Sequence, residues 1–94
     1  MTGGADPELA SDIARAERAL QDALNELRVR VSQGRRDDAS RELVRRCKDL
    51  ARLLREACGR LPNGDDEDAT RAAAEYLAAH VVILEREVEQ VPLH

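Results

Sequence analysis

The chain has 94 residues, of which 36% are charged, and a formal net charge of −4. This length suffices for one small domain, residues 1–94, whose core is marginal in stability unless it packs well or has a partner. The negative charge argues against a general nucleic-acid binder, so nucleic acid is an unlikely partner. A single tyrosine, with no phenylalanine or tryptophan, leaves little material for stacking bases or lining a ligand pocket.

The first residues, MTGGADPE, contain neither the basic region nor the apolar region of a secretory signal. The apolar run at residues 72–84 is shorter than the ~20 residues that a helix needs to cross a bilayer. We therefore predict a cytoplasmic protein with no membrane partner, whose two cysteines are reduced.

The first helix is predicted over residues 7–33, after a flexible tail at residues 1–5. Asp6 can cap the helix, and Pro7 stands where its missing N–H has no cost. Gly34 is a suitable residue to end it. Between these limits, apolar residues recur at steps of three and four and form one face: Leu9, Ile13, Ala16, Leu20, Leu24, Leu27 and Val31.

Two further helices are predicted, over residues 37–59 and 66–91. Asp37 or Asp38 begins the second, and Gly59 with the turn at residues 62–64 ends it. Acidic residues at 65–68 favour the start of the third helix, and Pro92 stops it before a flexible tail at 92–94. Because the connections are short, neighbouring helices should be antiparallel. The sequence thus predicts an all-α, up-down-up three-helix bundle with coiled-coil-like packing.

The third helix carries more apolar surface than one core face requires. Residues 72–84 read AAAEYLAAHVVIL, with a single charge, and Leu77, Val81 and Leu84 account for an ordinary core stripe. A second stripe lies about 100° away around the helix; it consists of Ala69, Ala72, Tyr76, His80 and Ile83. An exposed apolar stripe on a small protein predicts a protein-binding surface, here most simply for a second copy. Two simpler explanations are the helix propensity of alanine and a core broad enough to cover both stripes.

A basic stripe on the second helix is the next candidate site. At about 100° per residue it falls in a narrow arc opposite the apolar face, and it consists of Arg41, Arg45, Lys48, Arg52 and Arg55. A row of cations could follow a phosphate backbone. Acidic residues lie beside it, however, and pairs such as Arg45 with Asp49 are four apart and can satisfy each other. We interpret this stripe as a solvated face.

The cysteines and His80 are the third candidate. Cys47 and Cys58 are eleven residues apart on one helix, or ~16 Å, too far to share a disulfide or a metal ion. If the second and third helices fold back on each other, Cys47 and His80 should lie at about the same level. Such a pair could be a nucleophile or half a metal site. A buried cysteine is more often a small apolar residue, and no further catalytic group accompanies this pair.

The sequence therefore favours a non-catalytic protein–protein interaction module that uses the third helix, as a homodimer or as an adaptor for another protein. It predicts no enzyme activity, no cofactor and no metal site. One alternative is a thiol- or metal-responsive regulator in which Cys47 is the reactive thiol and acts with His80. A weaker alternative is a nucleic-acid-associated regulator that uses the basic stripe. The clean caps and short turns also fit a designed bundle, although two cysteines and an uncovered apolar stripe are less typical of one.

Overall fold

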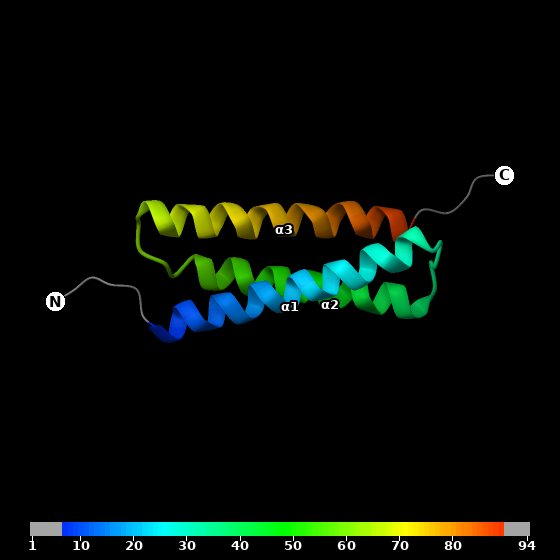
Figure 1. Cartoon of the computed structure of the whole chain (residues 1–94), viewed down its shortest axis with the longest axis horizontal. Coiled ribbons are helices and arrows are strands. Elements are labelled where there is room, and N and C mark those ends of the chain that lie inside the picture. Colours follow the sequence, from blue (N-terminus) through cyan, green and yellow to red (C-terminus); the bar gives the residue numbers. More distant parts are fainter. Residues whose placement is uncertain (1–6, 90–94) are drawn as a thin grey trace.

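The computed structural model describes residues 7–89, which form three α-helices connected by short turns (Figure 1). They are α1 (Pro7–Ser32), α2 (Asp38–Cys58) and α3 (Asp65–Glu89). The helices lie side by side, and α2 runs opposite to α1 and α3. The predicted all-α, antiparallel three-helix bundle is therefore confirmed. The predicted cap at Asp6, the last two residues of the helix predicted over 66–91, the stop at Pro92 and the tails at 1–5 and 92–94 lie outside the described residues.

The turn between α1 and α2 depends on Gly34, whose φ of 74° places it in the left-handed region. Its N–H donates to the carbonyl of Val31, and the N–H of Arg35 reaches back to the carbonyl of Arg30. This paired arrangement satisfies carbonyls that the end of a helix leaves open, and glycine adopts it without the steric cost of a side chain. The predicted end of the first helix at Gly34 is thus confirmed within two residues.

The start of α2 is capped by Asp37, whose carboxylate accepts a hydrogen bond from the backbone N–H of Ser40 at 2.9 Å. That hydrogen bond is the main cause of the lowered pKa of Asp37. The hydroxyl of Ser40 is buried and donates to the carbonyl of Arg35 at 2.9 Å. The two residues together fix the angle at which the chain enters α2.

Arginine side chains tie the connecting segments to the helices. The Arg71 guanidinium donates to the carbonyls of Leu61 and Pro62, which anchors the α2–α3 turn to the first turns of α3. At the opposite end of the bundle, Arg36 donates to the carbonyl of Glu87 at 2.8 Å. These hydrogen bonds satisfy backbone carbonyls in the α2–α3 turn and near the end of α3.

The core lies along the shared axis of the three helices and is aliphatic, as predicted. Its buried apolar residues are Ile13, Leu20, Ala23, Leu24 and Leu27 from α1; Val44, Cys47, Ala51, Leu54 and Cys58 from α2; and Ala74, Leu77, Val81, Leu84 and Val88 from α3. On α2 the fully buried side includes Val44 and Ala51, which face α3, whereas Leu43 and Leu50 are only partly buried on the side of α1.

The central helix of the three is α2. It packs extensively against both neighbours, whereas α1 and α3 contact each other less. A helix between two neighbours buries a broad arc, and a helix at the edge buries a narrower one. None of the described helices has an apolar stretch long enough to cross a membrane.

Candidate interaction surface

The side of α3 that faces away from the bundle is apolar over four helical turns. From Ala69 to Leu84, every exposed residue except Glu75 is apolar. We call this surface the α3 outer face; its residues are Ala69, Ala72, Tyr76, Ala79, Val82 and Ile83. Their spacings of three and four make them neighbours on the helix surface, so the face is continuous.

The large side chains of the α3 outer face are well exposed. Tyr76 is 65% exposed, Ile83 is 55% exposed and Val82 is 48% exposed. The described residues contain only two other large apolar side chains this exposed, Val29 on α1 and Leu53 on α2, and each stands alone on its helix. Scattered exposed apolar residues are ordinary on protein surfaces, but a contiguous group is characteristic of a contact surface.

The predicted surface and the observed one differ at His80. Its ring is half-buried in a hollow between α1 and α3, beside Gln21 and Arg28. The Nδ1 of His80 lies 3.3 Å from the carbonyl oxygen of Tyr76, to which it can donate, and the two rings meet edge to face at 4.6 Å. His80 therefore supports Tyr76 at the edge of the α3 outer face instead of standing at its centre.

Ala79 and Val82 belong to the α3 outer face, although the predicted stripe did not include them. The core stripe of α3 is narrow because only α2 packs closely against it along its length. The residues on the side of the second stripe that faces away from α1 are therefore exposed as well. The absence of charge from residues 76–84 was the sequence signal that could have identified them.

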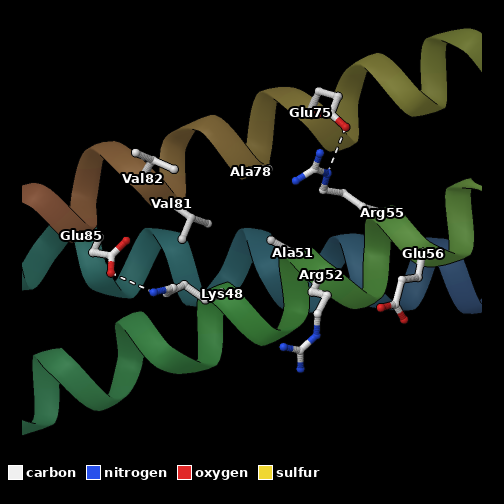
Figure 2. A pocket seen from close by; sticks show the side chains of 10 residues that line it. All are labelled: Lys48, Ala51, Arg52, Arg55, Glu56, Glu75, Ala78, Val81, Val82 and Glu85. Atoms are coloured by element: carbon white, nitrogen blue, oxygen red, sulfur yellow. Dashed lines mark hydrogen bonds and ion pairs between the residues drawn. The ribbon is translucent and has the colours of Figure 1, made fainter.

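A groove of about 580 Å³ runs between α2 and α3 along one border of the α3 outer face (Figure 2). Its floor is apolar and consists of Ala51, Ala78, Val81 and Val82. An ion pair crosses the groove near each end. Lys48 Nζ lies 2.9 Å from a Glu85 carboxylate oxygen, and Arg55 Nε lies 3.0 Å from one of Glu75. Small side chains at Ala51 and Ala78 leave the space open, and long charged side chains bridge it.

The basic stripe of α2 is exposed, and each of its five cations has an acidic partner. The within-helix pairs join residues three apart: Arg41 with Asp38, Arg45 with Glu42, and Arg52 with Asp49. The sequence predicts pairs four apart in which the acid follows the arginine, such as Arg45 with Asp49. In the structure each of these arginines pairs with the acid that precedes it, because a helical side chain points toward the helix N-terminus. Lys48 and Arg55 instead reach α3, so the stripe borders the groove and does not lie fully opposite the core.

Cys47 and Cys58 are both buried and unpaired with each other. Burial raises the pKa of the Cys47 thiol to about 11 and also raises that of Cys58. A thiol with a raised pKa is a poor nucleophile at neutral pH, since the thiolate is the reactive form. Within residues 7–89, no three side chains of the metal-binding types are grouped closely enough to hold an ion.

Cys47 and His80 have different surroundings. Cys47 is fully buried in the core, whereas His80 is half-buried on the side of α3 that meets α1.

The fold and this surface define a small antiparallel three-helix bundle with one uncovered apolar helix face. Comparison with known proteins finds no family model, no curated protein and no solved structure that matches the chain. Its function must therefore be inferred from the chemistry of its own surfaces.

Proposed function

We propose that this chain is a non-catalytic protein–protein interaction module whose binding surface is the α3 outer face. The observation that carries the proposal is the group of three large exposed apolar side chains, Tyr76, Val82 and Ile83, within about two turns of one helix. Burying such a group against a partner releases water from apolar surface, which is the main driving force of protein association. Tyr76 supplies the aromatic anchor that interfaces favour.

The charge around the α3 outer face also supports this proposal. Within residues 69–84 the face contains one exposed charged residue, Glu75, so a partner helix can approach without desolvating many ions. The alanines at 69, 72 and 79 permit close approach of a second helix backbone. The outward surface of α2, by contrast, is rich in ion pairs.

The proposal is tested by sedimentation velocity across a concentration series, with Ile83→Asp and the matched control Val29→Asp. Both positions carry a β-branched residue that is a little over half exposed, at 55% and 54%, but only Ile83 lies on the α3 outer face. We expect the wild type to associate, Ile83→Asp to weaken association about 30-fold or more, as for a central interface residue, and Val29→Asp to leave it unchanged.

Circular dichroism should show that both variants retain the helical fold. Association that Ile83→Asp leaves intact would contradict the proposed surface. If the wild type is monomeric at high micromolar concentration, the adaptor form is tested by co-purification from the native cell. A specific partner should then be retained by Val29→Asp and lost with Ile83→Asp.

A further inference from the structure

Two exposed charges on one flank of α3 are of opposite sign: Glu75, beside the middle of the α3 outer face, and Arg86, just past its C-terminal end. They are eleven residues apart, which at about 100° per residue leaves them only ~20° apart around the axis. Val82 lies between them on the same flank. The apolar stretch between these two charges is complementary to itself when one copy is reversed.

We propose that the occupant of the α3 outer face is a second copy of this chain, bound antiparallel about a twofold axis, with Glu75 of each copy paired to Arg86 of the other. This inference rests on the proposed function and names its partner. In such a dimer the α3 helices lie against each other, and the remainder of each bundle lies on the outside.

The geometry of the twofold axis agrees with the position of the apolar residues. For Glu75 to meet Arg86 of a second copy, the axis must pass beside residues 80–81, midway between them. The three large exposed side chains of the face, Tyr76, Val82 and Ile83, are centred at about residue 80, whereas the alanines at 69 and 72 extend the face toward its N-terminal end. With this axis Ala79 faces Val82 of the other copy, which places a small side chain against a larger one.

Within a twofold antiparallel pair, residues on one flank of the helix meet the same flank of the partner. Glu75 and Arg86 share a flank, so both ion pairs form at once on either side of the axis. Arg86 makes no ion pair or hydrogen bond with another residue of the described segment 7–89 and is available for this contact. Glu75 already holds Arg55, so each intermolecular site would combine one carboxylate with two guanidinium groups.

A parallel arrangement of the same helices is electrostatically unfavourable. It would leave the two copies of Glu75 at one level and the two copies of Arg86 at another, on opposite flanks of the contact, so that neither Glu75–Arg86 pair could form. It would also bring together two copies of the acidic first turn, Asp65–Asp68. Like charges held side by side oppose association, whereas the antiparallel pair moves the acidic turns to opposite ends of the contact.

Charge exchange tests the pairing directly. Glu75→Arg and Arg86→Glu should each weaken dimerisation about tenfold, because each single change creates two repulsive contacts. The double variant Glu75→Arg/Arg86→Glu restores opposite charges and should return to within about threefold of the wild-type dissociation constant. Arg55→Ala is the control for the pair that Glu75 forms within its own chain. It should leave dimerisation nearly unchanged.

Chemical cross-linking tests the orientation. With a short bismaleimide, Ala79→Cys should cross-link between copies, because position 79 lies close to the axis. Ala72→Cys should not, because the two copies of position 72 would be about 25 Å apart along the helix. The wild type, whose cysteines are buried, controls for background reaction.

The outcomes separate this inference from the proposed function. If Ile83→Asp abolishes the dimer but neither single charge change weakens it, the Glu75–Arg86 pairing is wrong. The α3 outer face would then still be the contact surface. Equal cross-linking at positions 72 and 79 overturns the antiparallel orientation. A wild type that stays monomeric overturns the second copy as the occupant. A dimer insensitive to Ile83→Asp defeats the proposed surface itself.

Discussion

The outward faces of α2 and α3 lie next to each other in the bundle but have opposite composition. On α2 the outward face is basic, and each cation has an acidic partner on the same helix or on α3. On α3 the outward face is apolar and has no partner within the described chain. Both helices have a long surface that faces away from the core. The cations of the basic stripe on α2 are paired within the protomer, whereas the apolar residues on the α3 surface stay exposed.

This difference follows from the position of each helix. Because α2 lies between two neighbours, its apolar residues other than Ala39 and Leu53 are wholly or partly buried, and many of its remaining positions are charged. An edge helix such as α3 needs only one apolar stripe for the bundle, but it has two. The protomer partly covers His80 of the second stripe but leaves Tyr76 and Ile83 exposed, and this exposed part supports the proposed external contact.

The largest expected contrast is between a buried leucine of α2 and its exposed sequence neighbour. Leu54 is 1% exposed and Leu53 is 53% exposed. Leu54→Ala should lower the free energy of unfolding by about 2–5 kcal/mol, the usual cost of a core truncation. Leu53→Ala should change it by less than ~0.5 kcal/mol. Urea denaturation measures both, and similar losses for the two variants would contradict the assigned core of α2.

An intermediate effect is expected from the buried thiol at Cys47. A thiol in the unfolded chain ionises near pH 9, whereas burial in the fold raises the pKa of Cys47 to about 11. The folded state therefore favours the protonated form, and stability that is fully present below pH 9 is lost as the pH rises toward 11. Two pKa units correspond to a loss on the order of 1–3 kcal/mol. The Cys47→Ala variant should show a shallower loss over this range than the wild type.

Thiol labelling gives an independent check of the same burial. A thiol-reactive reagent at neutral pH should modify Cys47 only at the rate at which the protein unfolds. Rapid labelling of Cys47 in the native protein would contradict its burial and favour the thiol-responsive regulator. Labelling with and without urea distinguishes these results.

The smallest expected effect concerns the ion pairs of the α2 face. Glu85→Gln removes the partner of Lys48 across the groove, and Glu42→Gln removes the partner of Arg45 within α2. The hydrogen bond from Lys48 to Glu85 is the main cause of the raised pKa of Lys48. We expect Glu85→Gln to lower the Tm by less than about 4 °C, and Glu42→Gln to lower it less, because exposed ion pairs contribute little.

High salt should reduce this small difference, since it screens exposed charges. Thermal melts of the two variants in low and high salt test the point. A larger loss for Glu42→Gln would contradict the view that the pair across the groove is the more important one.

The sequence was sufficient to predict the helices and the antiparallel order because local rules determine both. Gly34 has the left-handed conformation that its position after the first apolar stripe required, and Asp37 caps α2 through its own side chain. Apolar residues at steps of three and four predicted most of the core on each helix. These features depend on residues within a few positions of one another.

Features that depend on two helices at once could not be predicted in this way. The ion pair between Lys48 and Glu85 needs the register of α2 against α3, which no local pattern specifies. The half-buried position of His80 also depends on how α1 packs beside α3, because the hollow around its ring is lined by residues of both helices. The groove above Ala51 and Ala78 likewise exists only because two small residues face each other.

The central position of α2 has a consequence for how the chain reaches this structure. Its two extensive interfaces both join helices that are consecutive in sequence, and the contact between the distant helices α1 and α3 is the least extensive. Two helical hairpins that share α2 can therefore form without first closing a long loop. Proteins dominated by such local contacts fold within microseconds to milliseconds, so exposure of the apolar α3 segment to unwanted partners during folding should be brief.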